Sequence, residues 1–195
     1  NGRNGLWWAS KEGHTAVVKY LLGSDALVNY QLHEQAERAG TSALHMAAAH
    51  GRNECITVLV QGGADVALTE WKAGNTALHI SAAEGHEEAV RRLLDGGADN
   101  TFTNNAGQRP SDVATAAGHE RIATLIVKYH EAVEEIMTER GGTDGTSAQA
   151  ASAHHLIQMN SSGGPSIVWR RVEWILRRGR LEENREGNRM GGMEC

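Results

Sequence analysis

Four copies of one sequence pattern follow each other between residue 1 and about residue 130, and this repetition restricts the possible folds more than any other feature. In each copy a glycine follows a run of small residues, and successive glycines lie 38, 34 and 33 residues apart. These glycines are Gly13, Gly51, Gly85 and Gly118. A period of roughly 20 to 50 residues is typical of arrays of stacked units. The chain is therefore expected to form a stack instead of a single closed core.

Each copy has the pattern of two short helices. The first is rich in alanine and ends at the glycine, which can adopt a positive φ at a helix C-terminus. The second carries apolar side chains at helical spacing. These residues are Val17, Val18, Leu21, Leu22, Ile56, Leu59, Val60, Val90, Leu93, Leu94, Ile122, Leu125 and Ile126. One helix pair cannot bury them alone, whereas stacked pairs can, so the pattern predicts an all-α solenoid.

The residues before the first helices carry a more specific motif. Residues 40–45 read Gly-Thr-Ser-Ala-Leu-His, and residues 74–79 read Gly-Asn-Thr-Ala-Leu-His. This motif resembles the Thr-Pro-Leu-His signature of the ankyrin repeat family, whose period is about 33 residues. The resemblance covers residues 1–130. It implies an L-shaped stack with helix pairs on one side and hairpin fingers projecting from the other.

The motif departs from the family pattern at two of its positions. Ala43 and Ala77 stand where the pattern has proline. Trp7 in the first unit and Asp112 in the last stand where it has histidine.

The repeats divide the chain into predicted domains. The units are expected at about residues 1–33, 37–69, 71–103 and 104–140. In the last unit the apolar stripe continues from Ile122 to Met137, which predicts a capping helix of about 20 residues. Residues 141–166 are expected to form a flexible linker, followed by a basic amphipathic helix at 167–183 and a disordered tail at 184–195.

Two features near the N-terminus predict that the chain belongs to a longer array. It begins at Asn1 instead of methionine, within a stretch that would join a preceding unit. Trp7 and Trp8 lie on the first inner helix, although the terminal unit of a solenoid needs a polar outer face. We therefore expect further repeats before Asn1.

Composition and charge argue against several classes of protein. The 195 residues include 19 basic and 24 acidic side chains, a net charge of −5 at pH 7, so nucleic-acid binding through bulk positive charge is not expected. Two cysteines do not make a disulfide framework, which predicts a cytoplasmic protein, with the nucleus also open. No run of about 18 apolar residues indicates a membrane span.

The sequence contains no motif that predicts catalysis. It has no phosphate-binding loop, no zinc-protease helix and no nucleophile elbow, so we expect no enzyme activity, no cofactor and no metal site. His45 and His79, in the repeat motif, are expected to hydrogen-bond the backbone of neighbouring units. Cys55 occupies an apolar position on a second helix and is expected to be a small buried side chain.

A protein partner is expected to bind the finger tips and the inner helices, which are the variable positions of a solenoid. The predicted partner-binding residues are Glu34, Glu37, Arg38, Glu70, Trp71, Lys72, Asn104, Asn105, Lys11, His50 and Glu84. Trp71 is the strongest candidate because tryptophan is enriched in binding hot spots, and the alternative is that it folds back over the neighbouring finger. Residues 1–140 contain 12 basic and 18 acidic side chains, which favours a basic partner surface.

The predicted tail helix combines arginine with apolar residues. Residues 167–180 contain five arginines and one glutamate. The helix could pack back onto the repeats, bind a partner, or bind a membrane surface or calmodulin through residues 167–181. Its candidate binding residues are Val168, Trp169, Arg170, Arg171, Val172, Trp174 and Ile175.

The leading functional prediction is a monomeric, non-catalytic protein–protein interaction module that acts as a scaffold or adaptor. One alternative is a targeting or regulatory arm of a larger enzyme or channel, because repeat arrays of this kind are often parts of such proteins. Another is a membrane-associated or calmodulin-binding adaptor that acts through the tail helix.

Overall fold

The structure is a computed structural model, and it describes residues 5–24, 26–32, 39–139 and 168–178. These residues belong to two compact units, one that ends at Ile126 and one that starts at Val127. The predicted linker at 141–166 and the predicted tail at 184–195 lie outside the described residues.

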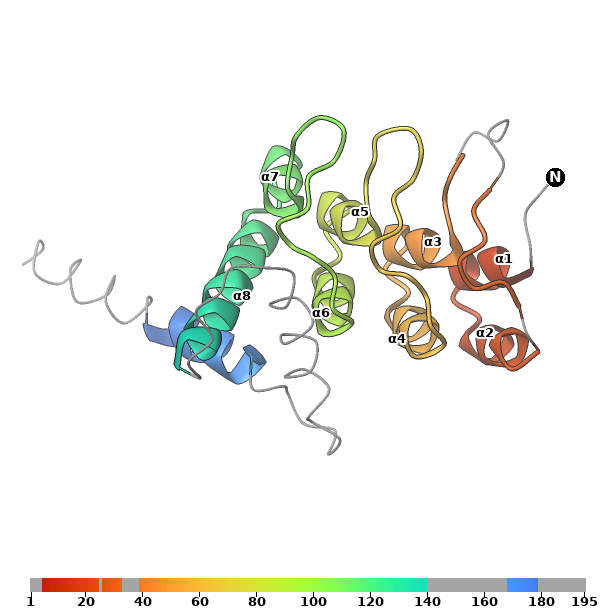
Figure 1. The fold of residues 1–195 in the computed structure, drawn as a ribbon, viewed down its shortest axis with the longest axis horizontal. Coiled ribbons are helices and arrows are strands. Elements are labelled where there is room, and N and C mark those ends of the chain that lie inside the picture. Colours follow the sequence, from red (N-terminus) through yellow and green to blue (C-terminus); the bar gives the residue numbers. More distant parts are fainter. Residues whose placement is uncertain (1–4, 25, 33–38, 140–167, 179–195) are drawn as a thin grey trace, which may run out of the picture. The chain divides into compact units, whose positions relative to one another are not determined.

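The first unit is a row of antiparallel helix pairs, as the repeat pattern predicts (Figure 1). Helices α1, α3, α5 and α7 contact each other in order, and α2, α4 and α6 form a second row beside them. The helices span Gly5–Glu12 (α1), Thr15–Leu22 (α2), Ala43–Ala49 (α3), Asn53–Gln61 (α4), Ala77–Ala83 (α5), Glu87–Asp95 (α6), Pro110–Ala116 (α7) and Glu120–Glu139 (α8). The start of α8, up to Ile126, completes the fourth pair. The all-α solenoid is confirmed.

Two of the glycines that end the first helices, Gly51 and Gly85, are needed for two reasons. Their backbone has a positive φ, and a side chain of the next repeat lies against them. Gly85 has a φ of +79°, and a Cβ placed on it would lie 2.7 Å from the ring of His119. Gly51, with a φ of +59°, is covered in the same way by the ring of His86. A side chain at either glycine would be strained and would also separate two neighbouring repeats.

His79 joins the start of α5 to the following repeat, whereas His45 accepts from Ser42 at the start of α3 and its buried Nε2 has no hydrogen-bond partner among the described residues. The backbone N–H of Thr76, just before α5, donates to Nδ1 of His79 over 3.3 Å. The proton of the ring therefore lies on Nε2, which donates over 3.1 Å to the carbonyl of Gln108 in the next repeat. The predicted bond between neighbouring units is confirmed at His79.

The core is made of the apolar side chains that the helical spacing selects. Val18, Ile56, Leu59, Val90 and Leu93 are all fully buried. Cys55 is also buried, at 1% exposure, and confirms the expectation of a small apolar role. Among the described residues, the single β-type pairing is an antiparallel bridge between Thr69 and Thr76 at the base of one finger.

The second unit contains the rest of α8 and a helix at residues 168–178. α8 has the length of about 20 residues that the apolar stripe predicts. Trp169 packs against Tyr129 of α8 with ring centroids 5.0 Å apart, and Arg171 pairs with Glu135 over 3.4 Å. None of the helices in the described ranges is long and apolar enough to cross a membrane.

Candidate functional site

Three fingers connect the repeats and project from the row of inner helices (Figure 1). Each is closed at its base by backbone hydrogen bonds, which in the second finger join the N–H of Glu70 to the carbonyl of Asn75 over 2.9 Å. The first finger is closed by the N–H of Leu32, which donates to the carbonyl of Thr41 over 3.1 Å. The predicted contacts Glu34, Glu37 and Arg38 of this finger lie outside the described residues.

Glu70 differs from the expectation of a partner contact, because the finger itself uses its carboxylate. The side chain is 9% exposed, and its oxygens accept from the backbone N–H groups of Lys72 and Ala73, each over 2.7 Å. Asn104 does the same in the third finger, where its Oδ1 accepts from Ala106 and Gln108. Both side chains stabilise the turn of their finger by accepting hydrogen bonds from its backbone N–H groups.

Trp71 is both exposed and supported by the neighbouring finger. Its side chain is 49% exposed, and its Nε1 donates to Oε1 of Gln31 over 3.3 Å. The indole lies over Gly40, where a Cβ would collide with it. Gln31 also donates from Nε2 to the carbonyls of Gly40 and Thr69. Both readings of Trp71 therefore apply: one part of the ring stacks on the first finger, and the other part faces outward.

Asn105 repeats this arrangement one finger later. It lies over Gly74 as Trp71 lies over Gly40, and its backbone N–H donates to the carbonyl of Ala73 over 2.9 Å. Asn105 is exposed. The stacking of Trp71 is one of the two alternatives that the sequence predicts. The sequence does not indicate the contact of Asn105, which lies 31 positions from Gly74 and differs in type from Trp71.

The remaining predicted contacts lie on or beside the fingers and the inner helices. Lys72 is exposed next to Trp71. Lys11 lies 4.9 Å above the ring of Trp8 and pairs with Glu12. His50 and Glu84 follow α3 and α5 at corresponding places, His50 half-buried and Glu84 exposed.

A shallow open depression of about 400 Å³ lies at the turns between inner and outer helices, and the sequence does not predict it. Its walls carry charges of both signs from three repeats: Glu12, Arg52, Glu54, Glu88 and Arg92. Most of these charges are already engaged. Arg52 donates to the carbonyl of Lys11 over 3.0 Å, so the depression offers no concentrated charge to a ligand.

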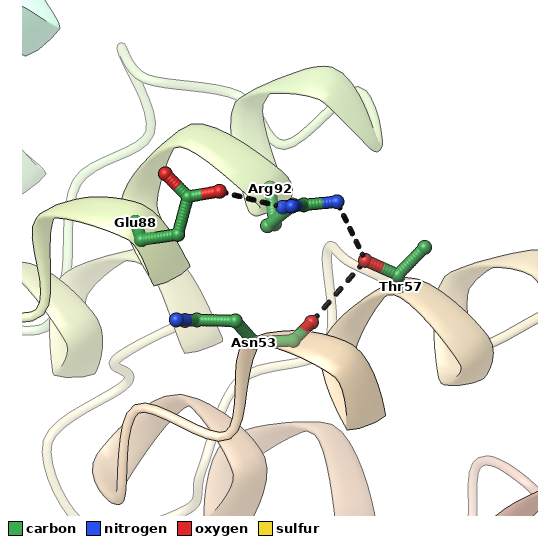
Figure 2. Close-up of polar contacts among 4 residues, drawn as sticks. All are labelled: Asn53, Thr57, Glu88 and Arg92. Atoms are coloured by element: carbon green, nitrogen blue, oxygen red, sulfur yellow. Dashed lines mark hydrogen bonds and ion pairs between the residues drawn. The ribbon is translucent and has the colours of Figure 1, made fainter. Parts of the chain in front are cut away.

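One side of the depression is a chain of polar contacts between α4 and α6 (Figure 2). Arg92 donates to Glu88 over 2.8 Å and to the hydroxyl of Thr57 over 3.4 Å, and this hydroxyl donates to the carbonyl of Asn53. The chain of contacts links two outer helices.

Two histidines of the repeats, His45 and His79, are buried in the stack. Burial lowers the pKa of His45 from 6.5 to about 4, partly opposed by the backbone carbonyls of Asn75 and Leu68. Burial also lowers the pKa of His79. Within the described ranges, no group of three or more His, Cys, Asp or Glu side chains could hold a metal ion. The arrangement can present a surface, and nothing described in it points to a reaction.

Several residues of the tail helix that were predicted to bind a partner are buried within the second unit. Val168, Trp169 and Val172 are at most 4% exposed, and Trp169 stacks on Tyr129 of α8. These side chains contact α8, which carries an apolar stripe that they can cover. Exposed on this helix are Arg170, Glu173, Trp174, Arg177 and Arg178.

Comparison with known proteins agrees with the geometry. A family model described as ankyrin repeats in many copies matches residues 6–60 and again residues 44–94. Among curated proteins, none matches the chain.

Proposed function

Because this chain belongs to the ankyrin repeat family over residues 6–94, we propose that it is a non-catalytic adaptor that binds a protein partner through the finger surface around Trp71 and Lys72. Repeats of this family generally serve protein–protein interaction, and a solenoid offers an extended surface for it. Fold alone does not define a function, so the proposal depends on the features of this surface.

The observation that carries the proposal is the state of Trp71. A tryptophan that is 49% exposed adds apolar surface that a partner could bury. Its hydrogen bond to Gln31 and its stacking on Gly40 hold the ring in one orientation. A side chain that is ordered before binding loses little conformational entropy on binding. Tryptophan is one of the residue types enriched in binding hot spots, and Lys72, next to it in the chain, is exposed as well.

Charge supports a basic partner surface. Residues 1–140 carry 12 basic and 18 acidic side chains, and Glu84 is exposed after the inner helix α5. Complementary charge speeds the encounter of two proteins more than it strengthens the final complex. The apolar contact of Trp71 would then provide most of the affinity.

The proposal is tested with the variant Trp71→Ala/Lys72→Ala and the matched control Tyr20→Ala. Tyr20 is an aromatic residue on α2 that is 74% exposed, so its loss also removes exposed ring surface. Proteins captured from a lysate by the unmodified chain are quantified against both variants, and each captured protein is then purified and titrated. A finger-bound partner loses about tenfold or more in affinity with the double variant and less than about twofold with Tyr20→Ala.

Thermal melts of the variants accompany these titrations. Trp71 contacts its neighbouring finger mainly through one edge, so we expect the double variant to melt within a few degrees of the unmodified chain. If every captured protein binds the double variant as tightly as the unmodified chain, the finger surface is not the binding site.

A further inference from the structure

We propose that the exposed side of the first helix pair packs against a further helix pair of the same repeat type, encoded in the same polypeptide before α1. This side, named here the leading face, consists of Trp8 on α1 and Ala16, Val17 and Tyr20 on α2. It has no residue in common with the finger surface around Trp71. The inference therefore stands independently of the proposed function.

Polar contacts between the second helices identify the positions that face the preceding repeat. These contacts reach positions three, four or seven residues after the glycine that ends the first helix of a repeat. They join Thr15 to Glu54 and Cys55 over 3.5 and 3.4 Å, Thr57 to Arg92 over 3.4 Å, and Glu87 to Arg121 over 3.0 Å. At each of the three junctions, at least one of these positions therefore receives the repeat before.

In the first repeat the same three positions hold Ala16, Val17 and Tyr20, and all three residues are exposed. Val17 is 47% exposed and Tyr20 is 74% exposed. At the position of Val17, the next two repeats have Cys55 and Ala89, which are 1% and 0% exposed. The side of α2 that corresponds to the covered side of α4 and α6 is thus exposed.

Trp8 extends the leading face onto the inner helix α1. Its counterpart on α3 is Met46, which is 1% exposed and packs in a cluster with Trp7 and Leu32 of the repeat before. Trp8 itself is 41% exposed. Trp7, by contrast, is 3% exposed and donates to Thr41 of the second repeat. Of the two tryptophans, it is therefore Trp8 that faces the side of a preceding repeat.

The leading face carries less charge than the same positions of the other repeats. The second and third repeats have Glu54 and Glu88 at the position of Ala16, and the fourth has Arg121. In the first repeat none of the three positions on the second helix carries a charge. A terminal repeat needs a polar outer surface for solubility, whereas exposed groups of apolar side chains mark interaction sites. The leading face therefore has the composition of a surface that is covered.

The junctions within the stack also show which surface fits the leading face. Leu22 of the first repeat lies against Gly62 of the second, 2.8 Å from a Cβ placed on it, and Val60 lies against Gly96 at 3.0 Å. Both aliphatic side chains come nine residues after the glycine that ends the first helix. We therefore expect the preceding helix pair to present an aliphatic side chain at this position. Opposite α2 it should present small or apolar residues, because the leading face offers them no charge.

The sequence just before α1 favours the same polypeptide as the source of this helix pair. Gly40 and Gly74 lie in the fingers before α3 and α5, each 11 residues before the glycine that ends that helix. Gly2 lies 11 residues before Gly13, so the finger pattern also precedes α1. A finger is closed by backbone hydrogen bonds to a segment that comes from the repeat before it. A second copy of the chain would provide helices without this connection.

The first experiment sequences the transcript upstream of the codon for Asn1. We expect a continuous reading frame that encodes one more unit, with a glycine 33 to 38 residues before Gly13, the range of the spacings within the chain. An aliphatic residue should follow nine positions after that glycine. A reading frame that starts close to Asn1, or an upstream sequence without this pattern, shows that the proposal is wrong.

The second experiment measures thermal melts of the full chain and of the variants Val17→Lys and Leu27→Lys. Leu27 is the matched control, because it is 72% exposed and its counterparts Asp65 and Asp99 are both charged and exposed. We expect both variants to melt within about 2 °C of the unmodified chain. A much larger loss for Val17→Lys alone would show that another segment of the chain already covers the leading face, and it would overturn the proposal.

The third experiment places the same substitutions in the chain extended by the upstream unit. The extension should raise the melting temperature by at least about 5 °C, because the stack gains a junction. Val17→Lys should remove most of this gain, since the new junction buries its charge, whereas Leu27→Lys should have the same small effect as before. An extension that does not raise the melting temperature, or one whose gain survives Val17→Lys, contradicts the proposal.

Sedimentation velocity tests a second copy of the chain as the occupant. We expect the extended chain to be monomeric, because its own preceding repeat covers the leading face. If the extended chain instead forms a dimer that Val17→Lys dissociates, the leading face binds a second copy and the proposal is wrong.

Discussion

Val17 on α2 is 47% exposed, whereas Cys55, Ala89 and Ile122, at the same position of the next three repeats, are at most 4% exposed. The outer helices α4 and α6, which carry Cys55 and Ala89, each contact the outer helix of the repeat before them. Trp8 shows the same difference at 41%, compared with 1% for its counterpart Met46 on α3. The comparison teaches that a repeat of this chain is buried by its neighbours and not by its own second helix.

The residue at the position of the motif histidine differs between the internal repeats and the two end repeats. His79, in an internal repeat, accepts from the start of its own helix and donates to the next repeat. Trp7, in the first repeat, donates to the hydroxyl of Thr41 in the next over 3.3 Å. Asp112, in the last, accepts from the N–H of Arg109 over 2.9 Å. A carboxylate can accept the hydrogen bond from the backbone at the helix start, but it has no proton to donate to a following repeat. It therefore fits the last of the four repeats.

The sharpest test of this comparison removes the same side chain from an internal repeat and from the first repeat. Leu59 on α4 is fully buried, whereas its counterpart Leu21 on α2 is only half-buried. Leu59→Ala should lower the free energy of unfolding by about 3 kcal/mol, and Leu21→Ala by about 1 kcal/mol. Urea unfolding followed by circular dichroism measures both. Equal losses would mean that neighbours do not determine burial in this stack.

The glycines offer a second pair with and without a neighbour. Gly85 and Gly118 have φ values of +79° and +83°, but a Cβ meets His119 at Gly85 and nothing within 4 Å at Gly118. Gly118→Ala should cost about 1 kcal/mol from the backbone conformation alone. Gly85→Ala should cost about 2 kcal/mol or more, because the His119 ring must also move. Thermal melts compare the two, and similar losses would contradict the coupling between repeats.

The internal histidines should make stability fall in mild acid. The pKa of His45 is about 4 in the folded chain and 6.5 in the unfolded one. Below pH 6.5 the unfolded state gains a proton at His45 that the folded state does not. The contribution of His45 to stability is therefore fully present above pH 6.5, and it is lost as the pH is lowered from 6.5 to about 4. At pH 5 the loss from His45 is roughly 2 kcal/mol.

The control for this pH dependence is His45→Gln, which removes the titrating ring. This variant should be less stable at neutral pH but should lose less stability between pH 7.5 and pH 5 than the unmodified chain. Urea titrations at several pH values give both slopes. Since the pKa of His79 is lowered as well, part of the slope should remain. An unchanged slope would show that His45 does not titrate as its burial implies.

The smallest effect is expected where two repeats touch through solvent-exposed polar side chains. Arg92 on α6 donates to the hydroxyl of Thr57 on α4 over 3.4 Å, and its side chain is 46% exposed. Exposed polar contacts of this kind contribute little, so Arg92→Ala should change the free energy of unfolding by less than about 0.5 kcal/mol. A double-mutant cycle with Thr57→Val isolates the contact between the two repeats. A coupling above about 1 kcal/mol would make polar contacts, and not only apolar burial, part of the stacking.

Much of the repeat architecture could be predicted because its signals are local and recur. Glycine is favoured wherever φ is positive, so Gly51 and Gly85 mark the ends of α3 and α5. Helical spacing selects the apolar side chains that the stack buries. The bond from His79 to the next repeat could also be predicted, because each repeat supplies its neighbour with the same backbone.

The candidate site could be predicted only in part, because several of its residues act through distant partners. Trp71 is identified by its type, but its support by Gln31 and Gly40 depends on two fingers lying side by side. Glu70 has the appearance of a surface charge until the turn closes around its carboxylate. The tail helix has an apolar face and a basic face, and the sequence alone does not show that the apolar face packs against α8.

The sequence by itself determined the repeat frame, the helix pairs and the alternation of apolar and polar positions, because each depends on residues close together in the chain. Only the tertiary structure decided which surfaces remain exposed. It buries Trp169 against Tyr129 and leaves Trp174 half-exposed on the same helix. The reason is that exposure depends on which segments, far apart in sequence, come to lie against each other.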